Sequence, residues 1–110
     1  MGRFVKGDVV VIPLPFSDLS AAKRRPSLVI TDLPGNDVIL CQITSRAVSN
    51  SNAIPLSTGD FADGSLRQNS NIRPDRLFTA DSHIILYRVG GLKPTKMQDV
   101  VAKIIQIVSA

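Results

Sequence analysis

The chain has 110 residues, the size of a domain with a single hydrophobic core, so we expect one domain over residues 1–110. Apolar residues make up 44% of the chain and charged residues 20%, a balance that argues against intrinsic disorder over most of it. Thirteen Lys and Arg against nine Asp and Glu give a formal charge of +4, which favours polyanionic partners.

The low counts of cysteine and histidine and the short apolar runs argue against several classes of protein. The only cysteine, Cys41, has no partner for an internal disulfide, which suits a reducing compartment. With one Cys and one His the chain cannot assemble a zinc-type ligand cluster, so we expect no metal and no cofactor. No apolar run approaches the roughly 20 residues that span a bilayer, and we expect no signal peptide because no charged-then-apolar segment is recognisable. We therefore expect a cytoplasmic protein without membrane association.

The first half of the chain predicts three strands. Residues 9–12 are a continuous β-branched run, typical of a strand buried on both faces. Two prolines follow and cannot donate hydrogen bonds inside a sheet, so residues 13–24 are expected to form a long loop, of the kind that often carries function. Residues 27–31 and 37–43 are the next strands, and the turn sequence Pro-Gly-Asn-Asp between them predicts a hairpin.

The second half predicts shorter elements. Residues 53–56 contain a proline and are expected to form a short edge strand, whereas residues 60–65 and 69–75 are interpreted as a turn and a polar loop. Two further strands are expected at residues 76–80 and 83–89. The Gly-Gly pair at residues 90–91 is expected to end the sheet.

A helix is expected to close the chain, because Pro94 suits the first turn of a helix. Apolar residues then recur at helical spacing and predict a stripe that belongs to the core: Met97, Val100, Val101, Ile104, Ile105 and Val108. The sequence therefore predicts a mainly β protein with a C-terminal helix (α+β), folded as a small, strongly curved β-barrel or sheet.

Two short stretches at predicted strand ends bring cations and hydroxyls together. Lys23-Arg24-Arg25 stands before one apolar run, and Thr44-Ser45-Arg46 ends the next one. If these runs are antiparallel neighbours, Arg25 lies near Thr44 and Ser45 at one edge of the sheet. Fixed positive charge, fork-like donors and hydroxyls at one edge form a site for a phosphate group. Composition alone leaves open the plainer interpretation of a surface basic cluster beside ordinary polar strand ends.

Other catalytic arrangements find little support. His83 is the only imidazole and is expected to open an apolar strand, so we interpret it as a partly buried structural residue and not as part of a Ser-His-Asp or Cys-His arrangement. The chain has no phosphate-cradling glycine motif. Carboxylates that could serve two-metal chemistry are scattered through predicted loops, at Asp60, Asp63, Asp75 and Asp81. What remains is metal-free phosphate chemistry by Arg and hydroxyl groups, in which RNA supplies its own 2′-OH as nucleophile.

The segments at these strand ends are recognisable as a group. Three of them resemble the MazF/PemK family of type II toxin–antitoxin ribonucleases: Gly7-Asp8-Val9-Val10, Lys23 to Ile30, and Cys41-Gln42-Ile43-Thr44-Ser45. The later Ser70-Asn71-Ile72-Arg73-Pro74, Leu77-Phe78-Thr79 and the closing helix are similar to one branch of that family. The resemblance extends over roughly residues 5–108, and the Arg-Pro and Ile-Thr-Ser pairing in this order is its most specific part.

This resemblance implies an SH3-like β-barrel that forms a homodimer and cleaves single-stranded RNA, such as mRNA, in short sequence contexts without metal. The products would carry a 2′,3′-cyclic phosphate and a 5′-OH. The family's catalytic Arg falls on Arg25 and its catalytic hydroxyl on Thr44, with Ser45 adjacent. Because a guanidinium is not deprotonated at ordinary pH, we expect Arg25 to stabilise charge and to donate a proton to the leaving 5′-oxygen, with the general base unassigned. The implied protein partner is a cognate antitoxin with an acidic, partly disordered segment.

RNA is expected to contact the long loop and the cations around the site. Candidate contacts are Phe16, Ser17, Lys23, Arg24, Arg46, Arg67, Arg73 and Arg76. Many relatives carry Gln where this chain has Arg46, a difference that bears on sequence preference more than on activity.

Two alternative functions stay open. One is a non-catalytic toxin of the same barrel that binds and poisons a DNA topoisomerase, against which the presence of Arg25 and Thr44 favours the ribonuclease. The other is a plain RNA-binding barrel, which usually interleaves aromatics with cations for base stacking. Aromatics are only 5% of this chain, and Phe16 and Phe61 are the best placed of them. Cleavage of single-stranded RNA in EDTA separates the ribonuclease from both alternatives.

Overall fold

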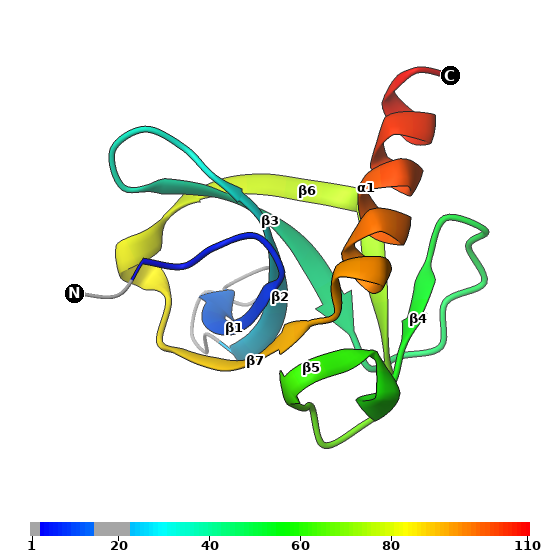
Figure 1. Cartoon of the computed structure of the whole chain (residues 1–110), viewed down its shortest axis with the longest axis horizontal. Coiled ribbons are helices and arrows are strands. Elements are labelled where there is room, and N and C mark those ends of the chain that lie inside the picture. Colours follow the sequence, from blue (N-terminus) through cyan, green and yellow to red (C-terminus); the bar gives the residue numbers. More distant parts are fainter. Residues whose placement is uncertain (1–2, 15–22) are drawn as a thin grey trace.

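The structure, a computed structural model, describes residues 3–14 and 23–110. These residues form a curled antiparallel sheet with an α-helix at the C-terminal end (Figure 1). In chain order the elements are β1 (Asp8–Leu14), β2 (Lys23–Asp32), β3 (Asp37–Thr44), β4 (Ile54–Leu56), the 3-10 helix η1 (Thr58–Asp60), β5 (Phe61–Gly64), β6 (Ser70–Asp81), the 3-10 helix η2 (Ser82–Ile84), β7 (Tyr87–Leu92) and α1 (Pro94–Val108). The predicted mainly β fold with a C-terminal helix is confirmed.

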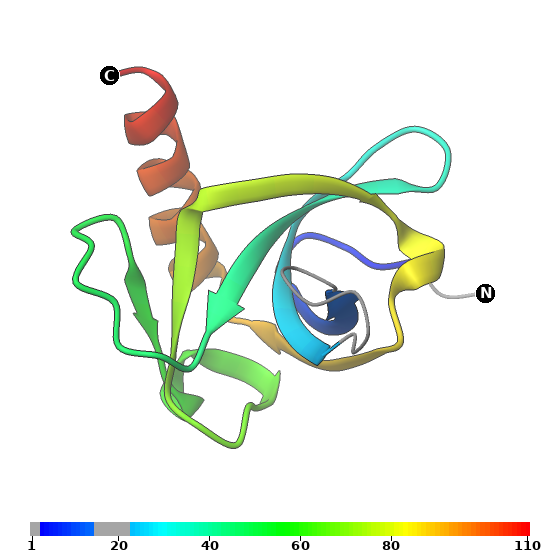
Figure 2. The same ribbon diagram turned by 180° about the vertical axis from the view of Figure 1, so that it is seen from behind.

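The described strands pair in the order β4-β6-β3-β2-β1-β7-β5. β2 and β3 form the expected hairpin, in which Ser27 lies opposite Gln42 and Leu28 opposite Cys41. β4 is an edge strand, as predicted from its proline. The sheet curves so strongly that both edge strands, β4 and β5, lie on the same side of the molecule as the helix (Figures 1 and 2).

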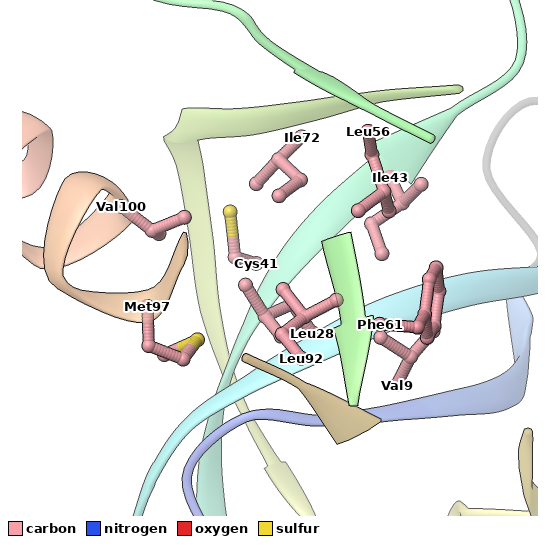
Figure 3. Close-up of a cluster of buried hydrophobic side chains, with 10 residues drawn as sticks. All are labelled: Val9, Leu28, Cys41, Ile43, Leu56, Phe61, Ile72, Leu92, Met97 and Val100. Atoms are coloured by element: carbon pink, nitrogen blue, oxygen red, sulfur yellow. The ribbon is translucent and has the colours of Figure 1, made fainter. Parts of the chain in front are cut away.

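Two apolar clusters occupy the two faces of the sheet. The first joins the curved sheet to α1 and contains Val9, Leu28, Cys41, Ile43, Leu56, Phe61, Ile72, Leu92, Met97 and Val100 (Figure 3). The second contains Val10, Ile12, Val29, Val38 and Leu40. Because successive side chains of a strand point to opposite faces, the neighbours Val9 and Val10 enter different clusters. β1 is therefore buried on both faces, as its β-branched run predicts.

The segment interpreted as a turn at residues 60–65 is mostly an edge strand. β5 pairs with β7, with Asp63 opposite Gly91 and Gly64 opposite Gly90. A Cβ on Gly90 would lie 2.5 Å from the carbonyl oxygen of Asp63, so a glycine is required there for the close approach of the two strands. The glycine pair therefore lies inside β7 and does not end the sheet, and both predictions are wrong.

Most of the polar loop predicted at residues 69–75 belongs to β6. Its pairing with β3 shifts at one point, where Cys41 faces Leu77 and the next residue, Gln42, faces Arg73. Pro74 lies inside this bulge, a position at which a sheet tolerates the missing N–H of proline. The thiol of Cys41 donates a hydrogen bond of 2.9 Å to the carbonyl oxygen of Arg73, which fastens the bulge to β3.

The loop after the first strand is shorter than predicted. β1 continues to Leu14 and β2 begins at Lys23, with Pro13 paired to Arg24 and Leu14 to Lys23. The described pairing of β1 with β7 ends at Val11, so Pro13 is not needed as a donor on that side. Residues 15–22, the remainder of the predicted loop, lie outside the described residues.

His83 does not open a strand. It lies in η2, where its side chain is 72% exposed and its Nδ1 is 2.9 Å from Oδ1 of Asp81. The prediction of a partly buried structural histidine is therefore wrong.

The predicted helix is confirmed, but its apolar stripe is only partly buried. Met97 and Val100 lie in the core, whereas Ile105 is 57% and Val108 73% exposed. The last turns of α1 extend beyond the sheet (Figure 2). The expectation that the whole stripe belongs to the core is thus wrong at this end. Over residues 3–14 and 23–110, no helix combines the length and the apolar character that a membrane crossing requires.

Candidate functional site

The register of the β2–β3 hairpin brings Arg25 and Thr44 to one edge of the sheet. The β2–β3 pairing ends at Ser27 and Gln42, and Arg25 on β2 and Thr44 on β3 lie two residues beyond that last pair. Arg25, Gln42 and Thr44 line the same cavity, of about 460 Å³, which we name the Thr44 cavity. The start of β2 and the end of β3 therefore contribute residues to one cavity.

The Thr44 cavity is strongly basic. Its lining includes the guanidinium groups of Arg25, Arg46, Arg73 and Arg76, together with uncharged polar side chains. Among the described residues, no carboxylate forms an ion pair with Arg25, Arg46 or Arg76. This lining suits a polyanion more than a neutral or cationic ligand.

Arg73 differs from the other three cations of the cavity because its charge is already paired. Its Nε and Nη2 donate hydrogen bonds of 3.2 and 3.1 Å to the two carboxylate oxygens of Asp75. These hydrogen bonds hold the pKa of Asp75 below its ordinary value. Asp75 also accepts a hydrogen bond of 3.0 Å from Nδ2 of Asn50, which ties the segment after β3 to β6. Arg73 is therefore placed to order the cavity wall more than to bind a phosphate.

The turn after β3 is held by two hydrogen bonds. The backbone amide of Arg46 donates to Oγ1 of Thr44 at 3.2 Å. Nδ2 of Asn71, which lies opposite Thr44 on β6, donates to the carbonyl oxygen of Arg46 at 3.2 Å. Together they fix the position of the Thr44 hydroxyl and of the Arg46 backbone at the mouth of the cavity.

Ser45 does not share the cavity of Thr44. It lines a second cavity, of about 550 Å³, which we name the Tyr87 cavity and which also includes Arg24, Arg25 and Arg67. Adjacent residues at a strand end point to opposite faces, so Thr44 and Ser45 separate. Arg25 lines both cavities and stands at the boundary between them.

The other residues predicted to contact RNA are divided between the two cavities and the surface outside them. Arg46, Arg73 and Arg76 line the Thr44 cavity, and Arg24 and Arg67 the Tyr87 cavity. Lys23 is exposed at the start of β2 and lines neither cavity. Phe16 and Ser17 lie outside the described residues.

The structure also corrects the choice of aromatics. Phe61 is 8% exposed and belongs to the core, so its selection as a well-placed aromatic is wrong. Tyr87, which the sequence reasoning missed, lines a basic cavity and is 47% exposed. Its one signal in the sequence is that it is the only tyrosine. Gln42 and Asn71 were also missed as site residues; Gln42 is a polar residue inside an otherwise apolar strand segment, whereas Asn71 lies in a polar stretch and gave no such signal.

Among the described residues, no three or more His, Cys, Asp or Glu side chains gather where they could hold a metal ion. The side chains that line the two cavities include guanidinium, hydroxyl and amide groups, all of which can donate hydrogen bonds to phosphate oxygens.

A comparison with protein families gave a match over residues 5–108, to the family described as PemK-like, MazF-like toxin of type II toxin–antitoxin system. A comparison with curated proteins gave no match.

Several solved structures share the fold. MazF from Deinococcus radiodurans superposes with a TM-score of 0.78 at 16% identity, over 100% of both chains. A mycobacterial endoribonuclease in complex with its cognate antitoxin has a TM-score of 0.77 at 13% identity, covering 97% of this chain and 96% of its own. Mycobacterium tuberculosis toxin MazF-mt6 has a TM-score of 0.72 at 19% identity, covering 93% and 96%. At these identities the likeness is one of fold.

Proposed function

Because the chain belongs to the family of PemK-like, MazF-like toxins of type II toxin–antitoxin systems, we propose that it is an endoribonuclease that cleaves single-stranded RNA without a metal. The observation that carries this proposal is that Arg25 and Thr44, from different strands, line one basic cavity. A fork-like cation beside a fixed hydroxyl is suited to a phosphate whose charge increases during reaction.

In the proposed reaction, the ribose 2′-OH attacks the adjacent phosphorus. The new 2′-O–P bond forms, the P–O5′ bond breaks, and the products carry a 2′,3′-cyclic phosphate and a 5′-OH. Arg25 donates hydrogen bonds to the non-bridging oxygens and to the leaving 5′-oxygen, while Thr44 donates to the phosphorane. Since a guanidinium keeps its proton at ordinary pH, Arg25 contributes hydrogen bonds here and not the proton transfer expected from the sequence. The proton lost by the 2′-OH and the one gained by the 5′-oxygen are exchanged with solvent.

The decisive experiment is incubation of the purified protein with a long natural single-stranded RNA in excess EDTA. We expect discrete cleavage, cyclic-phosphate ends, and no cutting where the scissile nucleotide is replaced by its 2′-deoxy form. Arg25→Ala, checked for folding by a thermal melt, is the matched negative control. A folded wild-type protein that leaves RNA intact in EDTA and in buffer with Mg²⁺ would contradict the proposal, as would cleavage that requires a divalent ion.

The proposal includes a protein inhibitor. The mycobacterial endoribonuclease with this fold is in complex with its cognate antitoxin, and an acidic, partly disordered antitoxin segment would complement the unpaired guanidinium groups of the Thr44 cavity. We expect this segment to compete with an uncleavable RNA for Arg25. Simultaneous binding of both ligands at undiminished affinity would place the inhibitor elsewhere.

The proposal also includes a homodimer, which light scattering of the purified chain would detect. The exposed apolar end of α1, at Ile105 and Val108, is surface of the kind that association buries.

A further inference from the structure

The Tyr87 cavity lies on the other side of Arg25 from the Thr44 cavity. Tyr87 is the first residue of β7 and pairs with Val11 of β1, which fixes its backbone against the neighbouring strand. Tyr87 is about half exposed, at 47%. The cavity volume of about 550 Å³ lies within the range of small-molecule sites. An aromatic side chain anchored on a strand and open to solvent offers a rigid surface to a flat ligand.

The remaining lining of the cavity is basic and polar. Arg24, Arg25 and Arg67 contribute cations, Ser45 and other residues contribute hydroxyls, and the lining contains no Asp or Glu. No carboxylate among the described residues forms an ion pair with Arg24 or Arg67. Cations that attract a phosphodiester backbone, next to an aromatic that a base can stack on, are the two components of single-strand recognition.

The shared residue connects this cavity to the proposed chemistry. Arg25 lines both cavities, so a strand whose scissile phosphate contacts Arg25 has a nucleotide on each side of that residue. A strand that runs from one cavity to the other would place one of these nucleotides toward Thr44 and the other toward Tyr87.

We propose that the Tyr87 cavity is a nucleotide subsite, in which one base next to the scissile phosphate stacks on Tyr87 while Arg24 and Arg67 contact the backbone. This inference rests on the proposed ribonuclease function for the identity of the ligand. Because every base has a stackable face, the subsite tolerates all four bases, and sequence preference must come mainly from elsewhere in the site.

The composition of the chain provides a direct probe. The sequence contains one tyrosine and no tryptophan, so intrinsic tyrosine emission reports on Tyr87 alone. We would titrate the wild-type protein with 2′-O-methyl homopolymers of about twelve nucleotides, which cannot be cleaved because the nucleophile is blocked. N-acetyltyrosinamide at the same absorbance controls for light absorbed by the nucleic acid. We expect saturable quenching of the emission, with an affinity that falls as salt is raised.

Variants test the stacking contact itself. Tyr87→Ala is expected to weaken binding of the same probes, measured by fluorescence anisotropy, by roughly five- to hundredfold. Tyr87→Phe should bind like the wild type, because it keeps the ring and removes only the hydroxyl. Leu86→Ala is the matched control: Leu86 is an adjacent, 46% exposed apolar residue that does not line the cavity, and its loss should leave affinity unchanged.

Three outcomes would overturn the subsite. They are binding detected by anisotropy without quenching of Tyr87, wild-type affinity in a folded Tyr87→Ala protein, and quenching that follows a change in oligomeric state measured by light scattering. If Tyr87→Ala does not fold, the quenching titration and the Tyr87→Phe variant still decide the question.

The result is separable from that of the proposed function. If the protein cleaves RNA in EDTA but neither quenching nor the Tyr87→Ala variant shows a contact at Tyr87, the subsite proposal is wrong and the ribonuclease proposal stands. If the probes quench Tyr87 and their affinity depends on Tyr87, but no RNA is cleaved, the subsite proposal stands and the ribonuclease proposal is wrong. A wild-type protein that neither binds the probes nor cuts RNA removes both.

Discussion

Oγ1 of Thr44 accepts a hydrogen bond of 3.2 Å from the backbone amide of Arg46. A hydroxyl that accepts from this side keeps its own proton for a second partner. Because Thr44 lines the same cavity as Arg25, that proton is available to a ligand held between the two side chains. The contact thus favours Thr44 as a hydrogen-bond donor to the phosphate and not as a proton acceptor.

We predict that the hydroxyl of Thr44 matters more than its shape. Thr44→Val keeps the β-branch and the volume but removes the donor, and we expect cleavage to slow by about a hundredfold or more. Thr44→Ser should retain much of the activity. Initial rates of both variants on one RNA, with thermal melts beside them, provide the measurement. Equal rates for Val and Ser would assign Thr44 a structural role and make Ser45 the candidate.

We predict that Arg25→Ala abolishes cleavage, with a loss of at least about a hundredfold to a thousandfold, while the fold is retained. Arg25 is only partly buried at the start of β2, so its truncation removes little core packing. Arg25→Lys should also be poor, since an ammonium lacks the bidentate fork. Cleavage rate and melting temperature are measured on the same preparation, and near-wild-type turnover in the Ala variant would refute the site assignment.

RNA binding is expected to weaken steeply with salt. Each cation that contacts a single-stranded phosphate contributes about −0.7 to the slope of log affinity against log salt. Arg46→Ala and Arg67→Ala should each make the slope shallower by less than one unit. Arg3→Ala serves as the control, because Arg3 lines neither cavity and is paired with Asp32 at 2.9 Å. An unchanged slope in Arg46→Ala and Arg67→Ala would show that these cations do not contact the RNA.

Arg88→Ala is predicted to destabilise the protein. Nε of Arg88 donates a hydrogen bond of 2.9 Å to Oδ1 of Asp8, whose side chain is only 8% exposed. Loss of the guanidinium leaves that carboxylate buried without its cation, at a cost of about 2–3 kcal/mol in the free energy of unfolding. Arg3→Ala breaks the exposed pair with Asp32 and should cost less than about 1 kcal/mol. Urea unfolding compares the two variants. Equal losses in the free energy of unfolding would contradict the role of Arg88 as the cation that pairs with buried Asp8.

The same arginine gives this effect a pH dependence. Arg88 donates hydrogen bonds of 2.8 and 3.0 Å to the two carboxylate oxygens of Asp63, and these hold the pKa of Asp63 below its ordinary value of 3.8. A lowered pKa in the folded state contributes stability above the unfolded value, and that contribution is lost as the pH falls through the folded-state pKa. The difference in stability between the wild type and Arg88→Ala should therefore narrow in acid.

Cys41 is expected to be inert in the folded protein. Burial raises the pKa of its thiol to about 12, so almost none of it is the reactive thiolate near neutral pH. The side chain is fully buried as well. Labelling by a thiol reagent at about pH 8 should proceed only as fast as the protein opens, and should become rapid in urea. Prompt stoichiometric labelling without denaturant would contradict the buried position of β3.

Local patterns determined the elements whose formation depends on nearby residues. The β-branched run at residues 9–12, the Pro-Gly-Asn-Asp turn and the helical spacing after Pro94 predicted β1, the β2–β3 hairpin and α1. The hairpin predicted that Arg25 and Thr44 lie near one another, and they line one cavity although the β2–β3 pairing itself ends at Ser27 and Gln42.

Some strands and cavities depend on contacts between residues that are distant in the sequence, and only the tertiary structure decided these. β5 is a strand because β7 provides glycines that allow close approach, and the polar start of β6 is a strand because a bulge against β3 accommodates Pro74. The separation of Thr44 and Ser45 into two cavities, and the exposure of Tyr87 in the second, follow from which face each residue occupies in the curled sheet. A shift of one residue in register moves a side chain to the other face, and no local pattern records such shifts.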